Sequence, residues 1–549
     1  MNILLILIAG LIVVIGSIVF ARLPAFLALT LGAILVAGLT PREMVFEAFI
    51  SQNSGQVGRV DGNSIELSGS VKTDDDVLLI APGLSDESDS ATLISVAKAR
   101  MANEQLLSAG STSFDSVTPG DVVVPRRHAQ VSVRRASQPA LTRVTTAMGE
   151  YFGKLAIIIV CASVIGRCLL DSGSAERVVR SVLTLLGQRL APTALTVSSF
   201  ILGIPVFFDT VFYLMIPIAK VLRIQTGANY LLYVLAIVAG ASMAHSLVPP
   251  TPGPLAVAEI FHVELSQMIL GGTIVGVVAA TAGLLWASMV NRITTLNVPE
   301  EDTAILEATA QKDESELPPV WLALLPIGLP VVLISLPALW ASLESPVNWV
   351  SPRLAQLMNP IVETLSNKNI ALLISAGVAL TIYLWNVRPS RQTMSEAMQS
   401  AIGSAGAILL ITCAGGAFGR ILFQTNVASL LDELPTMSPI VLVVAAFLVT
   451  AGVRTAQGSA TVAMMTSAGI FAPLVTSGAV DVAPLYMALA VGCGSKPIAW
   501  MNDSGFWIIT KMSGMTETQG LKFISPFGTV MGIAGLLAVI AAVILLPNP

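Results

Sequence analysis

Residues 191–217 read APTALTVSSFILGIPVFFDTVFYLMIP, a long apolar stretch that is interrupted in its middle at IPVFFDT. A weak copy, SPIVLVVAAFLVTAGVRTAQGSATVAMMT, occupies residues 438–466. Each copy is followed by a second interrupted stretch, LAIVAGASMAHSLVPPTPGPLAVAEIF at 235–261 and ALAVGCGSKPIAWMNDSGFWIITKM at 488–512. Hydrophobic segments broken at matching places in two halves are typical of secondary transporters, in which the breaks mark the binding site.

The composition is that of a polytopic membrane protein. The chain has 549 residues, 54% of them hydrophobic and 11% charged, and its mean hydropathy is +0.80. A water-soluble protein of this composition would expose large apolar patches. The net charge of -5 and the absence of a basic block argue against a nucleic-acid partner. The cysteines and histidines show no metal-ligand spacing, so no metal or other cofactor is expected.

Apolar windows of about 20 residues predict about ten spanning helices. The two interrupted stretches quoted first are predicted to be re-entrant hairpins, because non-helical backbone at membrane depth must be buried or line a cavity. Two full spans per stretch is the alternative interpretation. With five spans and one hairpin per half, the second copy starts on the opposite side of the membrane, so the repeat is inverted. The predicted fold class is an all-α polytopic membrane protein with about 5+5 transmembrane helices, two re-entrant hairpins and two broken helices.

Residues 51–145 depart from this pattern, because they are rich in Asp, Ser and Gly and contain no spanning segment. The runs SIELSGSV, DDVLLIAPG and GDVVVPRRHAQVSV predict a small strand-rich module inserted into the first repeat. The predicted organisation is first spans at 1–50, insertion at 51–145, core of repeat 1 at 146–290 with hairpin 195–222 and broken helix 230–262, linker at 291–318, and repeat 2 at 319–549 with hairpin 441–475 and broken helix 485–512.

Ionisable residues inside apolar stretches are costly in a bilayer and need a partner, a cavity or a function. Asp209 lies with Thr210 at the tip of the first hairpin, where it could accept a proton, bind a solute hydroxyl, or only cap a helix. Arg454 lies in the second hairpin. Its guanidinium stays charged and matches a carboxylate, which predicts an anionic solute. A fixed ion pair with Asp209 or Asp503 is the alternative.

Small and polar residues surround these charges. Gly458, Ser459 and Thr461 allow a ligand to approach backbone N–H groups at a helix start, although such runs also pack helices together. Asn502 and Asp503 could face a solute or a proton where the second broken helix opens. The remaining candidates are the helix-break residues Pro249, Pro250, Gly253 and Gly505, and two residues just before the breaks, His245 and Lys496, each of which could instead be a paired structural residue.

The motifs FFDTVFYLMIP, HSLVPPTPGPLAVA, RTAQGSATVA and NDSGFW, in this order and spacing, resemble those of the gluconate permease family, the gluconate:proton symporters of the larger ion transporter superfamily. The similarity extends over most of the chain outside the insertion. The resemblance implies proton-coupled uptake of gluconate or related sugar acids across the inner membrane, with some members handling glycerate or D-serine. It also implies a mobile transport domain on a scaffold that is a homodimer.

The sequence therefore predicts a secondary active importer of a hydroxy-carboxylate rather than an enzyme. In this hypothesis Arg454 and the backbone of residues 458–461 bind the carboxylate, Asn502 and Thr210 meet hydroxyl groups, and Asp209 or Asp503 binds the coupling proton. No GxxxxGK[ST] phosphate-binding loop occurs, so an ion gradient must drive transport, with sodium as the alternative to protons. A transporter-like receptor that uses the insertion is the second hypothesis. A membrane-embedded hydrolase ranks last, because no constellation of nucleophile, base and metal is found.

Overall fold

The computed structural model describes residues 3–546 with gaps at 20, 22, 51–54, 62–63, 69–76, 81–98, 104–105, 110–121, 295, 297–316, 338–339, 341–351, 427–437, 477–481 and 502. Most of the predicted linker at 291–318 and the predicted site residue Asn502 therefore lie outside the described residues.

Helices of membrane-spanning length make up the body of the protein. Within the described ranges, seven helices are long and apolar enough to cross a membrane, or eight if the bent pair α2–α3 is one span. The shorter apolar helices α1, α13, α19 and α20 fall below that length, which is why the number is smaller than the predicted ten. The long spans are α5 (Ala140–Asp171), α9 (Tyr230–Leu247) with α10 (Pro252–Ile260), α11 (Leu265–Ile293), α16 (Lys368–Val387), α17 (Arg391–Phe423), α18 (Pro439–Gln457) and α22 (Glu517–Leu545).

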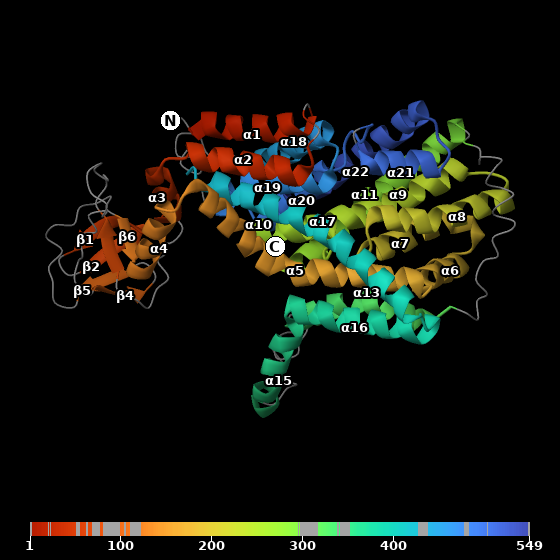
Figure 1. The fold of residues 1–549 in the computed structure, drawn as a ribbon, viewed down its shortest axis with the longest axis horizontal. Helices are drawn as coiled ribbons and strands as arrows, with labels where there is room; N and C mark the ends of the chain where they lie inside the picture. Colours follow the sequence, from red (N-terminus) through yellow and green to blue (C-terminus); the bar gives the residue numbers. More distant parts are fainter. Residues whose placement is uncertain are drawn as a thin grey trace.

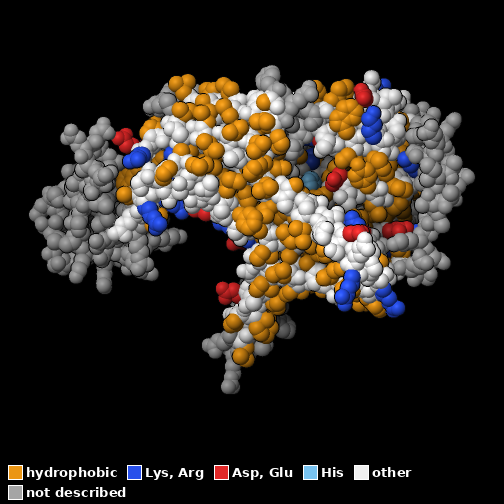
Figure 2. All heavy atoms as spheres, in the orientation of Figure 1, with side chains coloured by type: hydrophobic (Ala, Val, Ile, Leu, Met, Phe, Trp, Pro, Cys, Tyr) orange, Lys and Arg blue, Asp and Glu red, His pale blue; other side chains and the backbone are white. Residues whose placement is uncertain are grey.

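The other helices complete this body or flank it. They are α1 (Ile3–Val19), α2 (Ala25–Leu39), α3 (Arg42–Ile50), α6 (Ser174–Leu186), α7 (Ala191–Gly203), α8 (Phe208–Thr226), α13 (Val320–Ile334), α15 (Pro352–Ser366), α19 (Ala460–Thr476), α20 (Pro484–Gly494) and α21 (Ser504–Met512). Most helices run in a common direction, and α15 projects from the body (Figure 1). Hydrophobic side chains cover the middle of the visible face, and charged side chains gather toward its ends (Figure 2). This distribution is typical of a multi-pass membrane protein, because only the middle of the helices meets hydrocarbon.

Each half of the chain contains one helical hairpin and one broken helix. The hairpins are α7–α8, joined by residues 204–207, and α18–α19, joined by Gly458 and Ser459. The broken helices are α9–α10, interrupted at 248–251, and α20–α21, interrupted at 495–503. Each interruption lies where the sequence predicts one. The peptide bond between Pro249 and Pro250 is cis.

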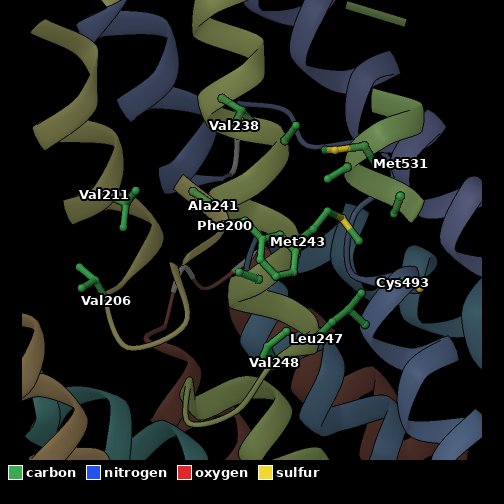
Figure 3. Close-up of a cluster of buried hydrophobic side chains, with 14 of the residues drawn as sticks. Phe200, Val206, Val211, Val238, Ala241, Met243, Leu247, Val248, Cys493 and Met531 are labelled. Atoms are coloured by element: carbon green, nitrogen blue, oxygen red, sulfur yellow. The ribbon is translucent and has the colours of Figure 1, made fainter. Parts of the chain in front are cut away.

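A tightly packed core holds the first broken helix against its hairpin. Helix α9 contacts both α7 and α11, and the buried side chains of Phe200, Met243 and Leu247 lie together there (Figure 3). Gly240 of α9 meets the α7 backbone so closely that an added Cβ would overlap the carbonyl oxygen of Thr196. The approach of these two helices therefore depends on a small residue at position 240.

We predict that Gly240→Val lowers the thermal stability of the detergent-solubilised protein, because overpacking typically costs about 1–3 kcal/mol. Gly377→Ala is the matched control, since a Cβ at this helical position meets no atom within 4 Å. Thermal unfolding followed by fluorescence-detected size-exclusion chromatography measures both variants. Equal melting temperatures for the two would contradict the packing argument.

The chain between α3 and α5 forms a sheet. Strands β1 (Gly55–Asp61), β2 (Ser64–Ser68), β3 (Val77–Ile80), β4 (Ala99–Asn103), β5 (Leu106–Ala109) and β6 (Val122–Pro125) are antiparallel and follow the order β3-β6-β1-β2-β5-β4. The sheet lies at one end of the helical body (Figure 1).

The prediction for the last part of the insertion, which expected a strand there, is wrong. The sequence predicted that the strand pattern runs through RRHAQVSV and that the insertion ends at residue 145. The structure instead places a helix, α4 (Arg126–Ala136), directly after β6, and α5 begins at Ala140. Helix α4 packs on α3, and an imidazole nitrogen of His128 contacts the carbonyl oxygen of Phe49 at 2.7 Å. Positions 128, 132 and 136 share one helix face, so this packing overrides the local alternation.

Candidate binding site

A cavity of about 420 Å³ lies where both hairpins and both broken helices meet. The first hairpin contributes Asp209 and Thr210, and the second contributes Arg454, Ser459 and Thr461. The first broken helix contributes Ser242, His245 and Pro252, the second contributes Ser495, Lys496, Asp503, Ser504 and Gly505, and α17 and α22 close the apolar sides.

Four helices begin at the wall of this cavity. The first residues of α8, α10, α19 and α21 are Phe208, Pro252, Ala460 and Ser504, and all four line the cavity. Helix N-termini carry partial positive charge and free backbone N–H groups. The free N–H groups of these four helix starts are donors that suit an anion in the cavity.

Arg454 connects the second hairpin to the second broken helix. Its Nε donates to the carbonyl oxygen of Ser495 at 3.1 Å, and one terminal nitrogen donates to the carbonyl oxygen of Gly458. The other terminal nitrogen makes an ion pair with Oδ2 of Asp503. The side chains of Arg454 and Asp503 are only 7% and 10% exposed. The alternative that the sequence left open, a pair between Arg454 and Asp503, is thus present in this structure.

Local sequence explains why these two charges meet. Gly458 ends α18 with a φ of 81°, a left-handed conformation that glycine adopts without strain, so the chain reverses directly after Arg454. Asp503 is the N-cap of α21, and its Oδ1 accepts the backbone N–H of Gly505 at 2.8 Å. Capping therefore fixes the carboxylate at the start of α21, facing the end of α18.

The first broken helix presents polar atoms to the same cavity. Nζ of Lys496 donates to the carbonyl oxygen of Ser242 in α9 at 2.8 Å. In the described part of the structure, Oγ of Ser242 and Nδ1 of His245 are buried and have no hydrogen-bond partner. The imidazole of His245 packs edge-on against Phe207 at 6.4 Å between ring centroids. Buried polar atoms without partners are rare in proteins, and here they border a space that can hold a solute.

Asp209 and Asp503 differ in environment although both line the cavity. Asp209 is exposed, and its Oδ1 accepts the backbone N–H of Thr210 at 2.9 Å in the first turn of α8. The N-cap of α8 is Phe207, and no side chain makes a cap hydrogen bond there, so the capping role that the sequence offered for Asp209 as an alternative is wrong. Asp503 is buried and paired. The two carboxylates therefore mark the entrance and the interior of the cavity.

The structure brings most of the predicted site residues together. Those that line the cavity are Asp209, Thr210, His245, Arg454, Ser459, Thr461, Asp503 and Gly505. The predicted residues Gly458, Pro249, Pro250 and Gly253 lie at the turns and helix breaks beside the cavity without lining it, and Gly253 packs against the side chain of Met464. Sequence reasoning did not assign Ser242 and Ser495, and it gave Lys496 no role in binding although it named this residue as a candidate.

No group of three His, Cys, Asp or Glu side chains that could hold a metal ion occurs among the residues that the structure describes.

We predict that Arg454→Met and Asp503→Asn each destabilise the protein, because breaking a buried ion pair typically costs about 3–5 kcal/mol. The double variant should be more stable than Arg454→Met alone, since it leaves no unpaired buried charge. Lys511→Met is the control, because Lys511 is 66% exposed and lies 3.8 Å from its partner Glu517. Thermal unfolding in detergent tests this, and strictly additive losses in the double variant would contradict the pairing.

A helical membrane body with a polar cavity between paired helix interruptions defines a transporter of a small polar solute. The chain belongs to the family described as GntP family permease, whose model matches residues 136–545. It is therefore a permease and not an enzyme, and the recognition made from its motifs is confirmed.

Individual relatives agree with this assignment. A gluconate permease of Zymomonas mobilis is 30% identical over 405 residues, which cover 72% of this chain and 87% of that protein. The inner membrane permease YgbN of Escherichia coli is 31% identical over 401 residues, covering 71% of this chain and 86% of that protein. The fold is similar to that of the Neisseria gonorrhoeae antimetabolite efflux pump MtrF, with a TM-score of 0.55, 18% identity, and coverage of 80% of this chain and 90% of that one.

Proposed function

We propose that this permease is a secondary active importer of gluconate or a related sugar acid, driven by proton symport across the inner membrane. The observation that carries the proposal is the cavity with Arg454 and four helix N-termini at its wall. Family membership supports the substrate class, because the Zymomonas mobilis relative is a gluconate permease. The volume of the cavity, about 420 Å³, lies within the range of about 300–1,000 Å³ that small-molecule sites occupy.

The polar atoms of the cavity suit a hydroxy-carboxylate. In the proposed mode, the carboxylate binds Arg454 and the N–H groups at the start of α19, near Ser459 and Thr461. Thr210, Asn502 and His245 meet hydroxyl groups of the substrate. The residues Pro249, Pro250, Gly253 and Gly505 keep the two helix breaks open beside it.

Competition for Arg454 couples the solute to a proton in this proposal. Arg454 is occupied by Asp503 in the present structure. A proton on Asp503 would cancel the ion pair and free one face of the guanidinium for the substrate carboxylate. Proton and anion would therefore bind together, which is what symport requires. Asp503 is the stronger candidate for the proton site, because Asp209 is exposed to water.

The architecture of the two halves supports further parts of the proposal. Matching hairpins and broken helices favour an inverted repeat organised as the sequence analysis divides it, with repeat cores at 146–290 and 319–549. A mobile transport domain on a homodimeric scaffold completes the proposed assembly.

Arg454→Ala should abolish accumulation of labelled gluconate in proteoliposomes, because the carboxylate loses its charged partner. Membrane insertion should stay intact, and reconstitution efficiency measured by immunoblotting is the check. Normal uptake by this variant would remove Arg454 from the binding site. Glycerate and D-serine tested with the wild-type protein determine whether a smaller solute is preferred.

Asp503→Asn should uncouple uptake from the pH gradient. The amide cannot ionise, so Arg454 stays available at every pH and gluconate exchange persists while proton-driven accumulation is lost. Counterflow and gradient-driven uptake measured in the same vesicles separate these two activities. Accumulation that still follows an imposed pH gradient would transfer the proton site to Asp209.

Wild-type vesicles that bind gluconate but accumulate none would instead favour a receptor that uses the sheet at residues 55–125.

A further inference from the structure

The interior of the cavity contains a second buried cation that the proposed function does not use. Lys496 lies between α20 and α21 and is 8% exposed. An ammonium group has three N–H donors, and the hydrogen bond to the carbonyl oxygen of Ser242 uses one of them. No carboxylate of the described residues lies within ion-pair distance of Nζ, whereas Arg454 is neutralised by Asp503.

When it is protonated, Lys496 is therefore the cation of the described cavity wall that has no carboxylate partner. The other charged or titratable groups that line the cavity are Arg454 and Asp503, which pair with each other, His245 of α9, and Asp209 at the entrance, and the thiol of Cys493 lies near Lys496 outside the lining. Asp209 is exposed and bonded to its own helix, so water screens its charge. A desolvated cation without a counter-ion is unfavourable, and an anion in the cavity removes that cost.

Unpartnered polar atoms lie at the same end of the cavity as this ammonium. The carbonyl oxygen of Ser242 accepts from Lys496, and Oγ of Ser242 is one of two buried atoms without a hydrogen-bond partner among the described residues that line the cavity. The other is Nδ1 of His245, less than one helical turn further along α9. A cation and two unpartnered polar atoms form a set suited to a carboxylate whose neighbouring carbon carries a hydroxyl group.

We propose that Lys496 is the residue that binds the substrate carboxylate while Arg454 is held by Asp503, and that Ser242 and His245 complete this end of the site. The inference rests on the proposed function and assigns the cavity two carboxylate-binding cations instead of one. Lys496 binds the anion first, and Arg454 joins it only when Asp503 releases the guanidinium.

Competition binding with two ligands tests this assignment. Gluconamide keeps the hydroxyl groups of gluconate and replaces its carboxylate by a neutral amide, so the ratio of the two dissociation constants reports recognition of charge. We expect the wild-type protein to prefer gluconate, and Lys496→Met to reduce that preference by at least about 10-fold, because a charged hydrogen bond is lost. Lys496→Arg should retain most of the preference. Lys511→Met, an exposed lysine on α21, should leave it unchanged.

The ratio also separates binding from folding. If Lys496 only stabilises the helix break, replacing it weakens the binding of gluconate and gluconamide equally. An unchanged ratio of the two dissociation constants in Lys496→Met therefore overturns the inference, while the proposed function stands. Lys496→Gln is the second neutral variant, used if Lys496→Met is not recovered from membranes, and the same loss of preference is expected. A wild-type protein that binds neither ligand would overturn the proposed function as well.

Discussion

The ion pair between Arg454 and Asp503 is the interaction on which the cavity depends. It joins the end of α18 to the start of α21, and the same two side chains also bond Gly458, Ser495 and Gly505. An unpaired charge buried in a membrane protein is costly, so either residue loses its partner at little cost only where another charge or a proton takes that partner's place. A site built around such a pair is sensitive to both protons and anions, because each can take the place of one member.

The two halves of the chain contribute different chemistry to the cavity. The second half supplies Arg454, Lys496 and Asp503, and the first half supplies Ser242 and His245 inside the cavity and Asp209 at its entrance. Both buried cations thus lie on the side of the second half. In the proposed function this asymmetry orients the substrate, with its carboxylate toward residues 454–503 and its hydroxyl-bearing chain toward α8 and α9.

Much of this arrangement follows from the sequence, because interruptions in apolar segments are local signals. The breaks at 248–251 and 495–503 and the turn at Gly458 could be predicted from Gly, Pro and polar residues alone. The ion-pair partners could not be predicted in the same way. Arg454 pairs with Asp503 rather than Asp209 because of how α18 and α21 approach each other, and the two paired residues are 49 positions apart in the chain. Helix α4 was missed for a similar reason, since its contact with α3 outweighs an alternating pattern that favours a strand.

In the proposed function, Arg454 can exchange partners with little movement of the backbone. Asp503 uses Oδ1 to cap α21 and Oδ2 to bind the guanidinium, so a proton on Oδ2 cancels the ion pair and leaves the cap in place. Arg454 keeps its bonds to the carbonyl oxygens of Ser495 and Gly458, and these hold the guanidinium at the cavity wall after Asp503 has released it. In the proposed function, the geometry that a substrate carboxylate needs is therefore already present before Asp503 is protonated. Such preorganisation lowers the cost of binding, because the cation does not have to be immobilised again for each substrate.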